Sequence, residues 1–353
     1  MFGFLGNRSG SLVGIDIGSS SVKLVALSKS GKGFSLDAYA IVSFSPNAVV
    51  DGNIQDVSEV GSAIEKAVKV AGGKLSSAVT AVPASAVITK TIEMSSAFTE
   101  FELEDQIKVE ADQFIPYPLD EVALDFEVQG ASKNNANIND VLLVACRKTD
   151  VEQREDAVGA AGLDSEIVDV DTYAVERAIK VIMSDQDDAN ALTGIVDIGA
   201  STLTLNVFKG TENIYTREQA FGGNDLTNLI SQQYGMSVEE VEQSLRLGDV
   251  SEDIIDAAVL PFRNTVAQQV SRALQFFYSS GAHGELETLY LSGGTSCIEG
   301  LPGQLEEELG LATQVANPFS SMNVNSRVNS VRLERDAQSL VKASGLALRG
   351  LQG

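Results

Sequence analysis

Apolar and polar positions alternate in two well-separated segments of the chain, residues 12–27 and 193–208, and the same short phrase interrupts both. A shift of 181 positions aligns residues 16–24 with residues 197–205, and five of these nine positions are identical. In each copy an apolar run reaches Asp-Ile-Gly, passes through hydroxyl residues and continues as an alternating strand. This pattern predicts two β-hairpins, one in each half of the chain.

A third apolar segment, residues 288–291, leads into Ser292-Gly293-Gly294-Thr295 and is followed by helical spacing over 301–309. We expect a strand, a glycine turn and a helix. Because glycine has no side chain, this turn would let a flat ring lie close to the backbone.

The stretch between the two hairpin segments has a pattern of its own. Residues 82–94 read as a strand after a proline turn, and apolar residues spaced four, four and three apart predict an amphipathic helix over 102–114. Two prolines then end the helix, and alternating strands follow at 123–128 and 141–145. The stretch is therefore predicted to be a β-α-β-β module inserted into the first half.

The hairpin turns suit phosphate binding. Gly18 and Gly199 can take backbone angles closed to other residues, so that successive N–H groups can point at an anion. Lys23 adds a positive charge, and hydroxyl donors follow both glycines: Ser19, Ser20, Ser21, Ser201 and Thr202. Asp16 and Asp197 would repel phosphate unless a divalent cation lay between them, so the pair predicts Mg²⁺ held by carboxylates and phosphate oxygens.

Composition and charge exclude several classes of function. With 353 residues, 44% of them apolar, the chain can build two lobes with cores of their own. Its 49 acidic and 25 basic residues give a net charge of −24, which disfavours binding to nucleic acid or anionic lipid. No apolar run of about 18 residues occurs, so we expect a soluble protein that meets membranes only through partners, or through Phe2, Phe4 and Leu5.

The histidine and cysteine content excludes two further kinds of site. A single histidine, His283, leaves no ligand set for zinc and no Ser-His triad. Cys146 and Cys297 lie far apart in the sequence and are expected to be free thiols.

In the order hairpin, hairpin, glycine turn, these elements resemble the actin-like ATPase superfamily, which includes actin, Hsp70, sugar kinases, FtsA and MreB. The resemblance implies an α/β protein of the actin-like ATPase (ribonuclease H-like) fold, with two pseudo-symmetric lobes and ATP with Mg²⁺ between them. It also implies that ATP contacts the glycine turn and two further positions of the second lobe: Gly293, Gly294, Thr295, Gly223 and Glu242.

Longer segments resemble one family more specifically, the PilM proteins of type IV pilus assembly. They are residues 86–94, 110–118, 214–223, 270–277 and 345–349. The resemblance implies a cytoplasmic protein at the inner face of the inner membrane that binds ATP and the N-terminal cytoplasmic tail of PilN. It would thereby join the assembly platform and couple it to the pilus motor, and it leaves open contact with the motor ATPases and self-association.

The inserted module is placed as in FtsA, which implies a division of the chain into successive parts. These are the first-lobe core 1–85, the inserted subdomain 86–160, a return to the first lobe 161–192, the second-lobe core 193–222, its cap 223–287, the core with the adenosine turn 288–335, and a C-terminal helix 336–353 that packs back on the first lobe.

Hydrolysis is expected to be slow. In relatives, a residue at the start of the helix leading out of the first lobe positions the attacking water, and Asp171 stands there, with Glu176 as the second candidate. Asp171 could equally cap that helix. Relatives often carry a lysine shortly after a Glu-Glu pair near the nucleoside, where this chain has Leu245, so Arg246 is the candidate substitute.

Two other functions share the nucleotide elements. A small-metabolite kinase would need an aspartate base beside a sugar pocket, whereas the inserted module offers a sheet surface. An FtsA-like filament former would share the module but normally ends in an amphipathic membrane-targeting helix, for which the segment 345–353 is too short.

Overall fold

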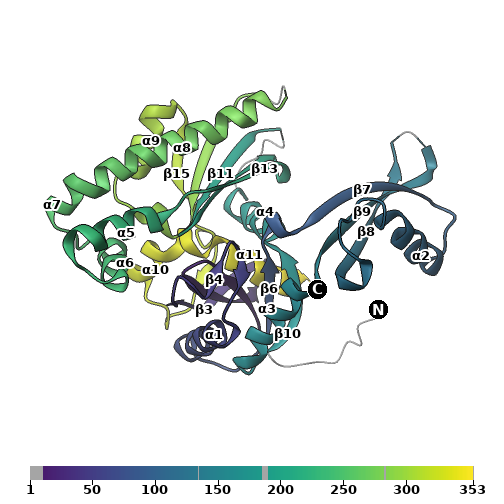
Figure 1. Cartoon of the computed structure of the whole chain (residues 1–353), viewed down its shortest axis with the longest axis horizontal. Helices are drawn as coiled ribbons and strands as arrows, with labels where there is room; N and C mark the ends of the chain where they lie inside the picture. Colours follow the sequence, from purple (N-terminus) through teal and green to yellow (C-terminus); the bar gives the residue numbers. More distant parts are fainter. Residues whose placement is uncertain (1–10, 134, 185–189, 282–283, 353) are drawn as a thin grey trace.

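The computed structural model describes residues 11–133, 135–184, 190–281 and 284–352. They form two lobes and an arm that projects from the first lobe (Figure 1). The N-terminal cluster and His283 singled out above lie outside the described residues.

Each lobe is built on one mixed β-sheet, and the two sheets have the same strand order. The first runs β10-β6-β1-β2-β3-β16 and the second β15-β14-β11-β12-β13. The first-lobe strands are β1 (Ser11–Ile17), β2 (Ser21–Ser30), β3 (Gly33–Ser43), β6 (Leu75–Val82), β10 (Asp164–Val170) and β16 (Asn323–Val324). Those of the second lobe are β11 (Leu192–Ile198), β12 (Thr202–Lys209), β13 (Glu212–Ala220), β14 (Thr288–Ser292) and β15 (Ala312–Val315).

Strand direction repeats as well. In the first lobe β1 pairs antiparallel with β2 and parallel with β6, and in the second β11 pairs antiparallel with β12 and parallel with β14. The two predicted hairpins are therefore β1–β2 and β11–β12, and each is central to its sheet. The predicted pair of pseudo-symmetric α/β lobes is confirmed.

Two helices lie between the sheets and belong to the cores of both lobes. They are α4 (Asp171–Ile182) and α11 (Val341–Gln352), near the centre of Figure 1. Val175 and Ile179 of α4 and Val341 of α11 pack against Ile195 and Tyr290 of the second sheet. On their other side, α11 packs on β1 and α4 on β6. The C-terminal helix is thus placed against both hairpins.

The outer faces carry the remaining helices. α1 (Val57–Ala71) and α3 (Lys148–Ala160) cover the first sheet, beside the short strands β4 (Val49–Val50) and β5 (Asn53–Ile54). The second sheet is covered by α5 (Gly223–Tyr234), α6 (Val238–Leu247), α8 (Leu260–Ser279) and α9 (Leu301–Leu309). A short helix α7 (Glu252–Ile254) and a π-helical turn (Ile255–Val259) lead into α8, and α10 (Ser330–Asp336) precedes the 3₁₀ turn (Ala337–Leu340) before α11. Within the described residues, no helix is both long enough and apolar enough to cross a membrane.

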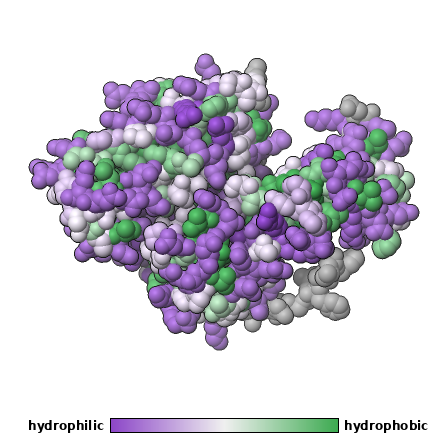
Figure 2. Space-filling view, in the orientation of Figure 1, coloured by the Kyte–Doolittle hydropathy of each residue, from purple (hydrophilic) through white to green (hydrophobic). Residues whose placement is uncertain are grey.

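The arm is the inserted module, with the predicted order strand, helix, strand, strand. It consists of β7 (Ile88–Ser95), α2 (Glu100–Ala111), β8 (Val122–Ser132) and β9 (Asn135–Arg147), and its sheet order is β7-β9-β8. Figure 2 shows it standing apart from the second lobe in this view. The helix starts two residues earlier than predicted because Thr99 and Glu102 form a capping box, a signal that the apolar spacing alone does not contain.

The FtsA-like division implies that residues 148–160 belong to the inserted subdomain, whereas helix α3 packs against α1 of the first lobe. Ala157 and Val158 belong to the first-lobe core. The buried Arg154 anchors the helix to the first lobe, because its guanidinium donates to the carbonyls of Ala81 at 2.7 Å and Gly52 at 2.8 Å. The sheet of the arm therefore ends at Arg147.

Candidate functional site

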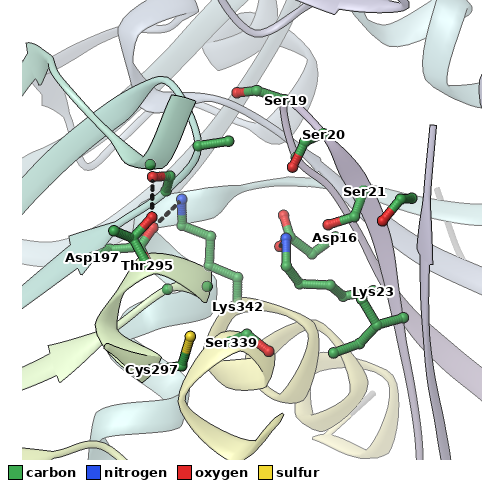
Figure 3. Close-up of a pocket in the computed structure, with 18 of the residues that line it drawn as sticks. Asp16, Ser19, Ser20, Ser21, Lys23, Asp197, Thr295, Cys297, Ser339 and Lys342 are labelled. Carbon is green, nitrogen blue, oxygen red and sulfur yellow. Dashed lines mark hydrogen bonds and ion pairs between the residues drawn. The ribbon is translucent and has the colours of Figure 1, made fainter. Parts of the chain in front are cut away.

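A cavity of about 890 Å³ lies between the two lobes, and it is lined by both hairpin turns and by the glycine turn after β14. Its walls also include parts of α6, α10 and α11. Figure 3 shows residues of the two hairpins, such as Ser19 and Asp197, facing the cavity together with Lys342 of α11. Sequence positions far apart meet here, and every predicted cofactor, metal and catalytic residue lines the cavity except Ser201 and the second catalytic candidate, Glu176. These are Asp16, Gly18, Ser19, Ser20, Ser21, Lys23, Asp171, Asp197, Gly199, Thr202, Gly223, Glu242, Gly293, Gly294 and Thr295.

The two hairpin turns close in the same way and meet each other. Gly18 N–H donates to Ser21 O at 3.1 Å, and Gly199 N–H donates to Thr202 O at 2.8 Å. The Ser201 hydroxyl does not line the cavity but lies 2.6 Å from the Ser19 hydroxyl of the other lobe. The serine pair thus joins the two turns across the lobes.

The glycines of these turns are favoured for a different reason from the one the sequence suggested. Neither Gly18 nor Gly199 is among the residues with positive φ. A Cβ at Gly18 would lie 3.0 Å from Lys23 Nζ, and one at Gly199 would lie 3.2 Å from Thr202 O. These positions therefore favour glycine because a side chain would crowd other atoms of the turn, and not because the backbone has a positive φ.

The glycine turn after β14 packs directly on the second hairpin. Gly293 has φ of 88°, and a Cβ there would lie 2.4 Å from the carbonyl oxygen of Ile198. Thr295 donates its hydroxyl hydrogen to Gly199 O at 2.8 Å. A Cβ at Gly294 would meet nothing within 4 Å, so this second glycine leaves open space at the cavity wall.

Gly223 starts α5 against the same turn. Its N–H donates to Gly199 O at 3.0 Å, and a Cβ on it would lie 2.5 Å from Thr295 Oγ1. The N-terminus of a helix, the second hairpin turn and the glycine turn thus form one packed cradle with N–H groups and hydroxyls at its surface, an arrangement suited to an anion.

Each hairpin aspartate in the cavity forms an ion pair with a lysine. Lys23 Nζ lies 3.3 Å from Asp16 Oδ2 within the first hairpin. Lys342 of α11, which the sequence did not single out, places its Nζ 2.8 Å from Asp197 Oδ2 and 3.4 Å from Asp171 Oδ2. Figure 3 shows Lys342 rising from its helix toward Asp197, with Asp16 and Lys23 on the opposite side of the cavity.

The ion pairs govern the ionisation of this cluster. Burial alone would raise the pKa of Asp197, but the Lys342 ammonium outweighs it and holds that pKa below its ordinary value. Burial would lower the pKa of Lys342, but Asp197 and then Asp171 keep it well above the ordinary value. Both groups are therefore charged at neutral pH.

The carboxylates suit a cation that takes most of its ligands from phosphate and water. Asp197 uses Oδ2 for Lys342 and accepts the Ser292 hydroxyl at 3.1 Å with Oδ1, whereas Asp16 uses Oδ2 for Lys23. Within the described part of the chain, no cluster of three or more His, Cys, Asp or Glu side chains could hold a metal ion. Mg²⁺ needs only one or two carboxylates beside phosphate oxygens, so Asp16 and Asp197 fit it without forming a cage of their own.

Asp171 lies at the cavity, but its carboxylate already has three partners, one of which is the Thr172 hydroxyl that donates to Oδ1 at 3.5 Å. Oδ1 accepts the N–H of Ala84 at 2.9 Å, and Oδ2 faces Lys342. Glu176 pairs with Lys180 at 2.8 Å and does not line the cavity. Glu218 of β13, which the sequence reasoning passed over although it lies in a family-like segment, does line it, and burial and then Asp171 raise its pKa.

On the nucleoside side, Glu242 and Arg246 of α6 line the cavity. Burial and then Glu239 raise the pKa of Glu242. Arg246, the candidate substitute for the lysine found in relatives, is engaged by the buried Asp336 at 2.9 Å and 2.7 Å. Its guanidinium is thereby fixed at the cavity wall.

The family-like residues of the arm mostly serve the core of the arm itself. Ile115 is 6% exposed, and the Phe114 ring lies under Lys90 at 4.2 Å. The exposed aromatic residues of the arm are instead Phe98 and Phe101, with Phe101 72% exposed.

Comparisons with known proteins agree with this geometry. The family model described as type IV pilus assembly protein PilM matches residues 14–351. A solved PilM–PilN type IV pilus biogenesis complex contains a chain similar to this one, with 26% identity and a TM-score of 0.79 over 97% of this chain and 99% of that one. The ethanolamine utilization protein EutJ from Carboxydothermus hydrogenoformans shares the fold, with 17% identity and a TM-score of 0.58 over 95% of this chain and 88% of its own. The chain thus has the actin-like ATPase fold, and it belongs to the PilM family of type IV pilus assembly proteins.

Proposed function

We propose that the protein binds ATP with Mg²⁺ between its lobes and, in that state, joins the type IV pilus platform by binding the cytoplasmic tail of PilN. The observation that carries nucleotide binding is the meeting of the two hairpin turns over one cavity, with Ser19 and Ser201 in contact across the lobes. Turn N–H groups and hydroxyls would hold the phosphates. The turn at Gly293 and Gly294, together with Glu242 and Arg246, would border the nucleoside.

Calorimetry with ATP and Mg²⁺ tests the site. Asp16→Ala removes a carboxylate from the metal side, and Gly199→Val crowds the second turn, where even a Cβ is 3.2 Å from Thr202 O. We expect each to weaken binding about tenfold or more, the worth of one charge-assisted contact. Asp105→Ala, on the exposed side of α2, is the matched control. Wild-type affinity in both site variants would reject the site.

When bound, Mg²⁺ supplies charge neutralisation between phosphate and the two aspartates. The chain's own residues would orient the nucleotide, through the two hairpin turns on one side and the glycine turn on the other. Asp171 is the proposed residue for positioning a water, and both of its carboxylate oxygens are already engaged, by the Ala84 N–H, the Thr172 hydroxyl and Lys342. We therefore propose slow hydrolysis, so that bound nucleotide acts mainly as a pin between the lobes.

PilN binding is proposed from the family and from the similarity to the chain in the PilM–PilN complex. We place the peptide on the inserted arm and its neighbour in the first lobe. The arm offers exposed aromatic side chains, Phe98 and Phe101, that an extended or amphipathic peptide can cover. The protein would then act at the inner face of the inner membrane through this partner, with contacts to the motor ATPases and self-association as further proposed links.

Fluorescence anisotropy with a labelled PilN tail tests the surface. Phe101→Ser should weaken binding about 30-fold, because an exposed aromatic residue buried at an interface is often worth 2 kcal/mol or more. Val70→Ser, an equally exposed apolar change on α1, is the control. If Phe98→Ser and Phe101→Ser both bind like the wild type, the arm is not the contact surface and the second lobe is the next candidate.

A further inference from the structure

The two phosphate hairpins differ in the residue that faces the aspartate. In β1–β2, the register pairs Asp16 with Lys23. In β11–β12, the corresponding pair is Asp197 with Thr204. The second hairpin therefore has an aspartate at the same position as the first, but no lysine opposite it.

Lys342 supplies that ammonium from the other end of the chain. Its Nζ is 2.8 Å from Asp197 Oδ2, and its side chain is 20% exposed, much as the 14% of Lys23. The cavity thus holds one lysine for each hairpin aspartate. The first lysine comes from the adjacent strand and the second from α11.

Backbone packing fixes the position of Lys342. Helix α11 touches β1 at Gly14, where a Cβ would lie 2.1 Å from the Ala343 carbonyl oxygen. On its other side it touches α4 at Gly345, where an added Cβ would overlap the Ala174 carbonyl. With both contacts at backbone level, the helix cannot shift away without losing packing, and the ammonium stays at the cavity.

The place it occupies is where a cation is needed. Asp197, Asp171 and Asp16 all act on Lys342 electrostatically, and Asp197 and Asp171 are within ion-pair distance of it. An ammonium there reduces the repulsion between these carboxylates and an incoming phosphate. At the second hairpin, Lys342 thus supplies a fixed positive charge for the phosphates that Mg²⁺ would otherwise have to supply.

We propose that Lys342 is a phosphate-binding residue, the counterpart of Lys23 for the second hairpin, and that it allows a nucleoside triphosphate to bind without Mg²⁺. The proposal rests on nucleotide binding as proposed above. It makes the metal a contributor to affinity rather than a condition of it.

The test is calorimetric titration of ATP into the full-length protein, once in Mg²⁺ and once in EDTA. The variants are Lys342→Met, which removes the charge, and Lys342→Arg, which keeps it. We expect wild type to lose about tenfold in affinity or less in EDTA, while Lys342→Met loses a further 10- to 100-fold in EDTA and less in Mg²⁺. Lys342→Arg should retain part of the EDTA binding. Lys180→Met, on α4 and away from the cavity, is the control.

Removing Lys342 leaves Asp197 and Asp171 without their partner, so Lys342→Met could fail to fold. The double variant Lys342→Met/Asp197→Asn restores the charge balance and should unfold near the wild-type temperature. Its ATP affinity in EDTA should lie between those of Lys342→Met and the wild type, because the change at Asp197 removes repulsion but supplies no ammonium for the phosphate. Binding by the wild type that vanishes in EDTA, or equal losses for Lys342→Met in both buffers, would overturn the proposal while leaving the ATP site intact. A wild type that binds no ATP even in Mg²⁺ would overturn the proposed function together with this inference.

Discussion

Arg246 donates two hydrogen bonds to Asp336, from Nε to Oδ1 at 2.9 Å and from Nη2 to Oδ2 at 2.7 Å. Tyr39 donates a third to Oδ2 at 3.1 Å. Asp336 is only 2% exposed and lies at the end of α10, whereas Arg246 comes from the second lobe and Tyr39 from β3 of the first. One buried carboxylate therefore links both lobes beside the cavity.

Breaking this link should destabilise the protein. Arg246→Met leaves the buried Asp336 with Tyr39 and a longer contact to Arg332 at 3.7 Å, and we expect the free energy of unfolding to fall by about 1–3 kcal/mol, a value reduced because Arg246 is partly exposed. Lys69→Met, which removes an exposed pair with Glu65, should cost less than about 0.5 kcal/mol. Urea denaturation measures both changes in the free energy of unfolding. If Arg246→Met costs no more than Lys69→Met, the buried pair stabilises the protein no more than an exposed one.

The same cluster predicts a dependence on alkaline pH. Burial and the neighbouring Asp336 raise the pKa of Tyr39 far above its ordinary value of 10.0. Above about pH 10 the unfolded chain loses this proton while the folded chain keeps it, so the free energy of unfolding falls as pH rises. Tyr39→Phe lacks the proton and should show a shallower fall between pH 9 and 11, measured by urea denaturation at each pH. Parallel curves for the two proteins would contradict the assignment.

Packing of α11 on α4 should tolerate no side chain at Gly345. An alanine Cβ there would overlap the Ala174 carbonyl, so Gly345→Ala must push the helices apart, at a cost of about 3 kcal/mol or more. Gly303→Ala, within α9, meets nothing within 4 Å and should instead stabilise by about 0.4–1 kcal/mol. Thermal unfolding should show a lower melting temperature for Gly345→Ala and a slightly higher one for Gly303→Ala. A melting temperature like that of the wild type for Gly345→Ala would contradict the close approach of the two helices.

The two glycines after β14 should separate folding from nucleotide binding. Gly293→Ala combines a positive φ with a contact to the Ile198 carbonyl and should lower the free energy of unfolding by about 1–3 kcal/mol. Gly294→Ala has room within the protein and should not lower the free energy of unfolding, and could raise it by up to about 1 kcal/mol, yet it adds a methyl at the cavity wall and should weaken ATP binding. If Gly294→Ala binds ATP normally, the base does not lie against this turn.

Several elements followed from local pattern. The hairpins at 12–27 and 193–208 became β1–β2 and β11–β12, and the segment 301–309 became α9, because alternation and helical spacing act over neighbouring residues. Boundaries in the arm were less accurate. Strand β9 runs over Asn135–Arg147, well beyond the predicted 141–145, because its polar positions pair with β7 and β8, and that pairing is not visible in one strand alone.

The sequence by itself determined the duplicated hairpins, the glycine turn and the family, since each of these is written in contiguous residues. The tertiary structure alone decided which charges meet. Lys342 lies in an ordinary helical segment with no motif around it. The packing of α11 on β1 and α4, close at two glycines, brings it to Asp197, 145 positions away. Ion pairing depends on distances in space, and these distances are fixed by how whole helices pack, which no short stretch of sequence records.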